Sequence, residues 1–366
     1  MRDSPLDRRK VLLASGAAAA SLAGCLSTNS TPPGDAGSDS DGSGNDDTSD
    51  GGNSVRPLSA GGSSTVYPIV SGAASVWKAN RPAGDEDYWQ PSEYGIQTDE
   101  NLAEYWGGLY GFDDGSGAPF DVTVGLSHSG TGIKKLKNGQ TDIANASAPV
   151  SAELPEADES TLEKFANHVV GVDAQPIVVS KEIYDAGVTK LTAEQVRKIY
   201  EGQITSWSEI DSYSGPDRAI QAVGRAEGSG TDTAFRSNLL GDSKAPMPGL
   251  DVRKGQNQKV KSLVEKSDNA IAYMALAFVG GDVETIALSF DGTEYVPGEN
   301  LADEDYPLSR DLHCYTWEGT SKKEAAFLRL ILSDYGQQNF VEPEGYSKLT
   351  KERQKNQIDK LPDPER

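Results

Sequence analysis

The chain has little cysteine, little histidine and a deficit of basic charge. Its 366 residues include two cysteines and three histidines, and 34 lysines and arginines face 56 aspartates and glutamates, a formal net charge of -22 at pH 7. Two cysteines exclude a disulfide-rich scaffold, and His128, His168 and His313 lack metal-ligand spacing, so we expect neither a metal nor another cofactor. The acidic balance argues against nucleic acid as a partner.

An apolar run long enough to cross a bilayer is also missing from the N-terminus. The run Val11–Ala20 is too short, follows Arg8-Arg9-Lys10 and precedes Leu22-Ala23-Gly24-Cys25. This pattern predicts a twin-arginine secretory signal over residues 1–24 and lipidation of Cys25 as the new N-terminus. We therefore expect an extracytoplasmic protein held on the outer face of the cell membrane by its lipid alone. The alternative is a plain export signal in which Cys25 is incidental.

Residues 25–56 have almost no apolar side chains and consist mainly of Ser, Gly, Asp, Asn, Thr and Pro. Such a segment cannot offset the entropy lost on ordering, so we expect a flexible tether. Removing residues 1–24, with four basic and two acidic residues, changes the net charge from -22 to -24. A charge this negative suits a protein built for very high salt, where the Debye length falls to about 3 Å.

The roughly three hundred residues that remain suffice for two lobes. Within them, the turn Arg225–Asp232 lies between an expected strand, Ala219–Val223, and an expected helix, Thr233–Leu240. The first N–H groups of a helix lack internal partners and the helix dipole is positive there, so a tetrahedral anion can bind. Arg225 would add a charge-assisted contact. The alternative is an ordinary N-cap, in which a hydroxyl of the turn caps the helix.

Two other polar turns have the same character. Ser59–Pro68 is rich in glycine and hydroxyls and precedes a helix whose apolar residues keep helical spacing from Ile69 to Trp77. Ser127–Gly132 follows an expected strand, Asp121–Leu126, and lacks the third glycine of a dinucleotide-binding fingerprint. Asp142–Pro149 is expected to be a short strand that ends in polar residues. The sequence thus predicts several anion-binding turns.

Four motifs in this order carry a family resemblance: Gly-Ser-Ser-Thr-Val-Tyr-Pro at 62–68, Ser-Gly-Thr-Gly-Ile-Lys at 129–134, Asp-Ile-Ala-Asn-Ala-Ser-Ala-Pro at 142–149 and Arg-Ala-Glu-Gly-Ser-Gly-Thr at 225–231. Further matches are Leu191–Gly202 through Trp207, Ala270–Tyr273 and Tyr306–Arg310. Over most of the chain after residue 58, the series resembles the phosphate-binding proteins of ABC phosphate importers, of haloarchaeal type.

The resemblance implies an α/β, two-lobed periplasmic-binding-protein (type II) fold whose chain crosses twice between the lobes. We expect the first crossing near Gly171–Val179 and the return near Ile271–Val283. Lobe I then joins residues 57–175 and 285–366, and lobe II holds residues 176–284.

Local patterns predict several further features. Thr192–Gln195 and Ser321–Glu324 have the pattern of capping boxes, and the second is expected to begin a helix that runs through Tyr335. Cys314 lies in a strand-like stretch and is expected to be a small buried hydrophobe.

Between Asn80 and Asp121, the chain carries an insertion longer than is usual for the family. Its aromatic residues include Trp89, Tyr94, Tyr105, Trp106 and Tyr110. We favour an elaboration that packs these rings on lobe I over a permease contact or a lid at the cleft edge.

The resemblance also implies which residues bind the ligand: Ser64, Thr65, Val66, Ser129, Ser147, Arg225, Ser229, Gly230 and Thr231. Several relatives carry a carboxylate where Ser147 aligns, and others carry Ser followed by Arg, where this chain has Ala148. We therefore expect a site with one cation, Arg225, and no carboxylate acceptor, and hence limited rejection of sulfate. Glu227 is the next candidate acceptor.

The implied function is capture of phosphate in an interlobe cleft by a monomer and its delivery to the transmembrane subunits of an ABC permease. A binding protein for another oxyanion, such as sulfate, molybdate or tungstate, is the alternative. An enzyme with Ser129 or Ser229 as nucleophile is disfavoured, because no Gly-x-Ser-x-Gly elbow occurs and only His128 lies near a binding loop. An anchored structural protein would leave the anion-binding turns unexplained.

Overall fold

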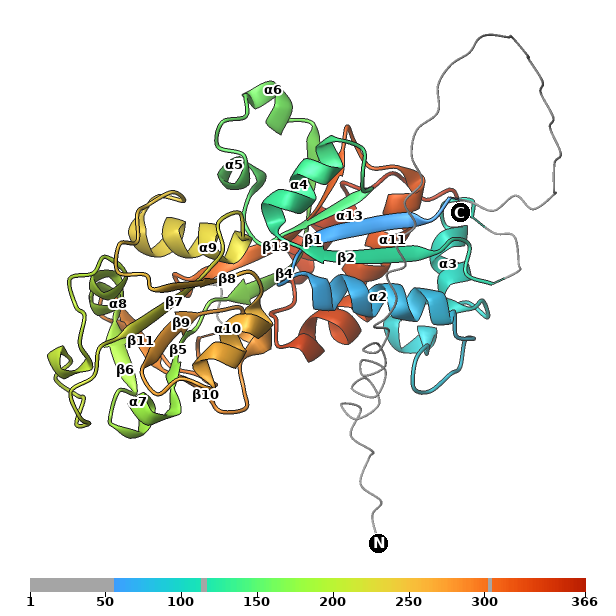
Figure 1. Cartoon of the computed structure of the whole chain (residues 1–366). Coiled ribbons are helices and arrows are strands. Elements are labelled where there is room, and N and C mark those ends of the chain that lie inside the picture. Colours follow the sequence, from blue (N-terminus) through green and yellow to red (C-terminus); the bar gives the residue numbers. More distant parts are fainter. Residues whose placement is uncertain (1–55, 113–116, 302–304) are drawn as a thin grey trace, which may run out of the picture. The chain divides into compact units, whose positions relative to one another are not determined.

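The computed structural model describes residues 56–112, 117–301 and 305–366 (Figure 1). The expected signal over residues 1–24, the lipidation site Cys25 and all but the last residue of the tether lie outside these ranges. Within the described ranges, no helix combines the length and the apolar character that crossing a bilayer requires.

The first sheet is mixed and has the strand order β2-β1-β3-β13-β4. Its strands are β1 (Leu58–Ser63), β2 (Val122–Ser127), β3 (Ile143–Ala146), β4 (Phe165–Ala174) and β13 (Ser309–Trp317). Strand β1 runs parallel to β2 and β3, whereas β13 is antiparallel to β3 and β4. Parallel neighbours need helical crossovers, and the helices that follow β1 and β2 supply them.

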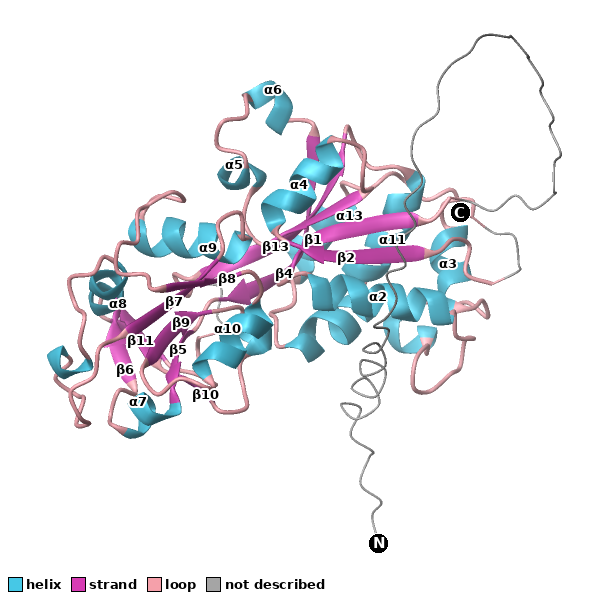
Figure 2. Cartoon of the chain, in the orientation of Figure 1, coloured by secondary structure: helices cyan, strands magenta, loops and turns pink. Residues whose placement is uncertain are grey.

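Helices cover both faces of this sheet, as Figure 2 shows. One face packs against α2 (Tyr67–Ala79), α3 (Leu102–Gly108) and α11 (Lys322–Leu332), and the other against α4 (Ser129–Lys137). Successive strand residues point to opposite faces, so Cys314 joins the first core and its neighbour Tyr315 the second. Cys314 is a free, fully buried thiol, which confirms its expected role as a small core residue.

The second lobe contains two further sheets, of order β10-β5-β9-β7-β8 and β12-β11-β6. Their strands are β5 (Ile177–Ser180), β6 (Lys190–Thr192), β7 (Gln221–Arg225), β8 (Val252–Lys254), β9 (Ala270–Tyr273), β10 (Val283–Thr285), β11 (Ala287–Phe290) and β12 (Thr293–Tyr295). Strand β7 is parallel to β8 and β9, and β5 is antiparallel to β9 and β10. The molecule therefore has a two-lobed α/β architecture with a mixed sheet in each lobe.

The chain passes from the first sheet to the second between Ala174, the last residue of β4, and Ile177, the first of β5. The return differs from the expectation that lobe I resumes at residue 285. Strand β10 bonds to β5 and β11 bonds to β6, so the backbone hydrogen bonds of residues 283–290 keep them with the second lobe. The return lies instead between β12 and β13, and the expected boundary is corrected accordingly.

Shorter helices complete the two lobes. They are α5 (Val150–Glu153), α6 (Glu159–Leu162), α7 (Lys181–Asp185), α8 (Ala193–Tyr200), α9 (Gly230–Phe235), α10 (Asn257–Val264), α12 (Asp334–Gly336) and α13 (Lys351–Ile358). Single 3-10 turns occur at Pro91–Tyr94, Trp207–Glu209, Leu276–Phe278 and Glu342–Glu344, and π-helical turns at Arg236–Leu240 and Gln337–Val341.

Both expected capping boxes are present. Thr192 caps α8 reciprocally with Gln195, and Ser321 caps α11 reciprocally with Glu324. Helix α11 ends at Leu332 rather than continuing through Tyr335, because Ser333 has an extended backbone and its hydroxyl caps α12.

The aromatic insertion packs on the first lobe. Trp89, Trp106 and Tyr110 are buried in the core formed by α2 and α11, and the Trp89 ring lies edge-on to Tyr335 with ring centroids 5.3 Å apart. The interpretation of this segment as an elaboration packed on lobe I is confirmed.

Candidate functional site

The residues expected to bind an anion lie at the carboxyl ends of β1, β2 and β3 in the first sheet and of β7 in the second. Ser64, Thr65 and Val66 join β1 to α2, Ser129 begins α4 after β2, Ser147 follows β3, Arg225 ends β7, and Ser229, Gly230 and Thr231 form the start of α9. Ligands in open α/β sheets bind beyond the carboxyl ends of the strands. The topology therefore gathers motifs from distant parts of the sequence at one place.

All nine of these residues are buried, and Thr65, Ser129 and Ser147 of the first lobe meet the start of α9 in the second. The backbone N–H of Gly230 donates to Ser129 Oγ at 3.1 Å, and the same oxygen accepts from the N–H of Ser147 at 3.2 Å. Ser63 Oγ donates to Ser147 Oγ at 3.0 Å. Three loops of the first lobe thus meet α9 directly.

Only glycine fits at position 230. An added Cβ would lie 2.3 Å from Ser129 Oγ and 2.6 Å from Ser147 Oγ, well inside van der Waals contact. The close approach of the two lobes therefore depends on a missing side chain.

Arg225 is 1% exposed and is held by neutral acceptors. Its Nη1 donates to Thr231 Oγ1 at 3.0 Å and to Asn257 Oδ1 at 2.7 Å, and its Nη2 donates to Ser64 Oγ at 3.1 Å and to Gly255 O at 2.9 Å. Burial, together with the nearby positive charge of Arg310, lowers the pKa of Arg225 to about 10. The side chain thus stays protonated at neutral pH, and this buried cation has no ion-pair partner among the described carboxylates.

Arg310 is a second cation at the same place, so the expectation of a single cation is wrong. Its Nη2 lies 3.3 Å from Thr65 Oγ1 and 3.2 Å from Thr231 Oγ1. Arg310 enters from β13, 245 positions after Thr65, and the sequence gives no spacing by which to place it there. Arg310 does lie in the motif Tyr306–Arg310, and that motif is the one feature of the sequence that could have indicated it as a site residue.

Carboxylates also lie closer to the candidate anion site than the sequence predicts. Asp173, on β4, accepts from Arg310 Nε at 3.0 Å and from Arg310 Nη2 at 2.6 Å. Burial pushes the pKa of Asp173 up, and the Arg310 guanidinium opposes that rise. Glu227, the candidate acceptor named from the sequence, has 79% of its side chain exposed and lies near Arg253 rather than among the buried hydroxyls.

Glu153, on α5, is a third carboxylate near the lobe contact. Burial raises its pKa to about 8, although hydrogen bonds with Thr233 and with the backbone of Gly130 act in the opposite direction. Its Oε1 is buried without a hydrogen-bond partner. Glu153 therefore holds its proton at a pH where an exposed glutamate is ionised.

Ordinary helix capping does not account for the hydroxyls of this turn. Ser229 occupies the N-cap position of α9, but its side chain makes no capping hydrogen bond. Thr231 Oγ1 instead accepts from Arg225 and Arg310 and lies 3.1 Å from Thr65 Oγ1. These hydroxyls join the two lobes.

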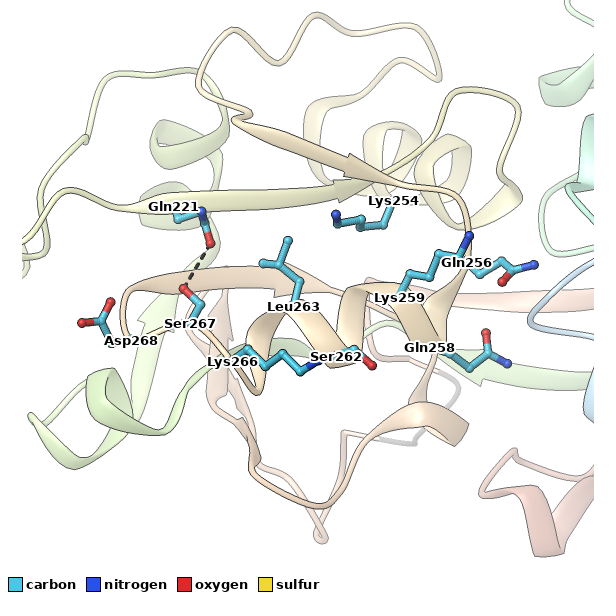
Figure 3. Close-up of a pocket in the computed structure, with 10 residues that line it drawn as sticks. All are labelled: Gln221, Lys254, Gln256, Gln258, Lys259, Ser262, Leu263, Lys266, Ser267 and Asp268. Carbon is cyan, nitrogen blue, oxygen red and sulfur yellow. Dashed lines mark hydrogen bonds between the residues drawn. The ribbon is translucent and has the colours of Figure 1, made fainter. Parts of the chain in front are cut away.

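A surface pocket of about 1050 Å³ lies apart from this cluster, beside β7, β8 and α10 (Figure 3). It is lined by Gln221, Lys254, Gln256, Gln258, Lys259, Ser262, Leu263, Lys266, Ser267 and Asp268. None of the nine expected residues lines it. It adjoins the cluster at Lys254, whose carbonyl accepts from Arg225 Nε at 3.3 Å.

Comparison with known proteins identifies the same fold. The family model described as "PBP superfamily domain" matches residues 108–335 of this chain. A solved candidate phosphate ABC transporter substrate-binding protein from Clostridium perfringens, with bound phosphate, is 22% identical, with a TM-score of 0.59 over 80% of this chain and 100% of that one. An ABC-type phosphate transport receptor from Vibrio cholerae is 24% identical, with a TM-score of 0.54 and coverage of 80% and 100%. The fold is therefore that of a type II periplasmic binding protein.

A curated relative gives the family. The phosphate-binding protein PstS of Bacillus subtilis is 30% identical over 230 residues, which are 63% of this chain and 72% of the relative. Together with the superfamily match over residues 108–335, this similarity shows that the chain belongs to the PstS family of phosphate-binding proteins.

Proposed function

We propose that the protein captures phosphate between its two lobes and delivers it to the transmembrane subunits of an ABC permease. The observation that carries the proposal is Arg225, a buried guanidinium whose hydrogen bonds end on neutral oxygens. A buried charge is stable only when it is compensated, and an oxyanion supplies that compensation.

The residues that would hold the anion are those expected from the sequence. Hydroxyls of Ser64, Thr65, Ser129, Ser147, Ser229 and Thr231 and backbone N–H groups of Val66 and Gly230 would donate to its oxygens, beside the Arg225 guanidinium. Among these residues every donor is neutral except Arg225, which supplies a charge-assisted contact. Arg310 lies beside them as a second cation, paired with Asp173. Closure of the lobes removes the anion from water, where these contacts are strongest.

Calorimetric titration in high salt tests the proposal. The purified domain is titrated with phosphate, arsenate, sulfate, molybdate and tungstate. Tight binding of phosphate supports the proposed ligand, whereas tighter binding of sulfate, molybdate or tungstate would assign another oxyanion. Failure to bind any of the five would overturn the proposal.

Selectivity against sulfate would depend partly on Ser147. A hydroxyl can donate to either anion, whereas an ionised carboxylate accepts only from protonated phosphate and repels an anion that has no proton. Ser147→Asp should therefore weaken sulfate binding more than phosphate binding, measured as a pair of titrations near neutral pH. An equal loss of both anions would remove Ser147 from the selectivity assignment.

Binding without turnover is the activity that we assign. Among the described residues, Ser129 Oγ accepts from two backbone N–H groups, and neither Ser129 nor Ser229 has a histidine as hydrogen-bond partner. A serine nucleophile needs a base within hydrogen-bond reach. Incubation with a chromogenic phosphate ester should accordingly release no product above that of Arg225→Ala.

We further propose that the protein is a monomeric, lipid-anchored, extracytoplasmic protein of haloarchaeal type. The support is the twin-arginine and lipobox pattern ending at Cys25 and the net charge of -22. Two lipid chains suffice for stable anchoring, so Cys25→Ala should appear in the medium in folded form that binds phosphate. Persistent membrane association of that variant would indicate an uncleaved signal anchor instead.

A further inference from the structure

The most unusual group in the buried cluster is Arg310, which is only 7% exposed. Its Nε and Nη2 are engaged by Asp173, yet its Nη1 is buried without a hydrogen-bond partner. A buried guanidinium N–H without an acceptor is costly and is rare in proteins. The unpaired nitrogen belongs to a side chain whose other terminal nitrogen touches the hydroxyls of Thr65 and Thr231.

The two arginines converge on one atom from opposite lobes. Arg225 Nη1 and Arg310 Nη2 lie 3.0 Å and 3.2 Å from Thr231 Oγ1. Their mutual repulsion contributes to the lowered pKa of Arg225. An oxyanion that accepts from both guanidinium groups would relieve this repulsion and satisfy the free N–H of Arg310 at the same time.

Asp173 determines the net charge that Arg225 and Arg310 together offer to a bound anion. Its Oδ2 accepts from Arg310, and its Oδ1 accepts from the N–H of Leu276 at 3.0 Å, so both oxygens are occupied. Asp173 is therefore not a proton acceptor for the anion. Its charge cancels that of Arg310, and the two arginines with Asp173 carry a net charge of +1 instead of +2.

We propose that Arg310 contacts the bound anion as a second guanidinium and that Asp173, acting through Arg310, limits the preference of the site for fully ionised dianions. Arg310 is then a binding residue, and Asp173 is a positioning residue that sets selectivity. The inference rests on the proposed function and adds to it a source of discrimination between protonated phosphate and sulfate. This discrimination requires no carboxylate at position 147.

The experiment compares phosphate and sulfate titrations of wild type, Arg310→Met, Arg310→Lys and Asp173→Asn. Arg310→Met should weaken phosphate binding at least tenfold. Arg310→Lys should restore part of the loss, because lysine returns the positive charge but not the forked donors of the guanidinium.

Asp173→Asn keeps the Oδ1 acceptor for Leu276 but removes the charge. It should lower the ratio of phosphate affinity to sulfate affinity at least tenfold and make phosphate binding strengthen as the dianion fraction rises with pH.

The matched control is Asp311→Asn. Asp311 follows Arg310 on β13 and forms an ion pair with Arg353 on α13, which the substitution removes. It should leave the phosphate-to-sulfate ratio unchanged. A merely structural role of Asp173 would weaken both anions by the same factor, and that result would overturn its role in selectivity.

The Arg310 variants carry the test if Asp173→Asn fails to fold. Phosphate binding by folded Arg310→Met within threefold of wild type would overturn the contact. If wild type binds phosphate but these variants do not show the expected losses, only the roles of Arg310 and Asp173 are refuted. If wild type binds neither phosphate nor sulfate, phosphate capture itself is refuted as well.

Discussion

A single side chain holds the uncompensated charge of the candidate site. Arg225→Ala should abolish tight phosphate binding, because removing the cation leaves a buried anion undercompensated, at a cost of about 3 kcal/mol or more. The fold should persist, since the Arg310–Asp173 ion pair and the hydroxyl contacts of the cluster remain. Calorimetry reports the affinity, and circular dichroism reports the fold.

Arg218→Ala is the matched control for this experiment. Arg218 lies in the same lobe but pairs at the surface with Asp268, so its loss should leave phosphate binding unchanged. An Arg225→Ala variant that binds phosphate as tightly as the control would remove Arg225 from the site.

Glu153 should make lobe closure sensitive to pH. Its pKa is about 8 in the contacted form, against an ordinary value of 4.5, so the contacted form retains a proton that an exposed Glu153 would release. Below about pH 4.5, Glu153 is protonated both when the lobes are in contact and when they are apart, so pH does not affect closure. Between pH 4.5 and about 8, closure weakens as pH rises, and above about pH 8 the stabilisation of closure by the Glu153 proton is fully lost.

The measurement is sulfate affinity from about pH 5 to about pH 9, because sulfate itself does not titrate in this range. Asp232 and Arg310 also act on Glu153, and Glu153→Gln leaves both in place. Affinity should fall with pH in wild type and stay nearly level in Glu153→Gln. Parallel profiles in the two proteins would assign the pH dependence to another group.

The residues of the candidate site could be located from sequence only where they lie in a local motif. Arg225 and most of the hydroxyls lie in or beside glycine-rich turns, and their residue types indicate anion binding without any knowledge of the fold. Asp173 lies in no such pattern, and the motif Tyr306–Arg310 marks Arg310 by family resemblance but does not indicate anion binding. These two residues meet because β13 pairs with β4 in an antiparallel register that places Arg310 opposite Asp173, a long-range contact that one sequence does not specify.

At the scale of elements, the helix starts that carry capping boxes were predictable, whereas α9 begins at Gly230 rather than at the expected Thr233. The capping boxes at Thr192 and Ser321 are local hydrogen-bond patterns, so the sequence alone locates them. The return between lobes was not predictable in this way. Strands β11 and β12 are four and three residues long. Their lobe is decided by the pairing of β11 with β6, about a hundred residues earlier, and of β12 with β11.

The start of α9 offers a test of an element rather than of a side chain. Gly230→Ala adds a Cβ that would lie 2.3 Å from Ser129 Oγ, so α9 and α4 could not keep their present separation. Phosphate affinity should fall at least tenfold, or about 1.4 kcal/mol.

Gly72→Ala is the control, because a Cβ in the middle of α2 would meet only Phe340 Cδ1 at an ordinary 3.8 Å. This variant should bind like wild type and gain a little stability from the better helix former. Equal affinities for Gly230→Ala and Gly72→Ala would show that phosphate binding does not need this close contact.

At the scale of the whole molecule, ligand binding and stability are linked. A ligand that binds only the folded protein stabilises it by about 2.7 kcal/mol at a concentration of 100 times Kd. Each kcal/mol raises the Tm of a domain of about this size by roughly 2 °C or more. Phosphate should thus raise the Tm of wild type by several degrees and that of Arg225→Ala hardly at all, as followed by calorimetric melting. An equal rise in both proteins would point to a general salt effect.

The buried thiol in the first core also makes the protein suitable as an optical reagent. Burial raises the pKa of Cys314 to about 12, and the sequence from residue 56 onward contains no other cysteine. Since only the thiolate reacts with electrophilic dyes, Cys314 should remain unlabelled. A cysteine introduced at Glu227, whose side chain is 79% exposed two residues after Arg225, would then be the single labelled position. A fluorophore placed there would change its surroundings when the lobes close, so its emission would follow the phosphate concentration.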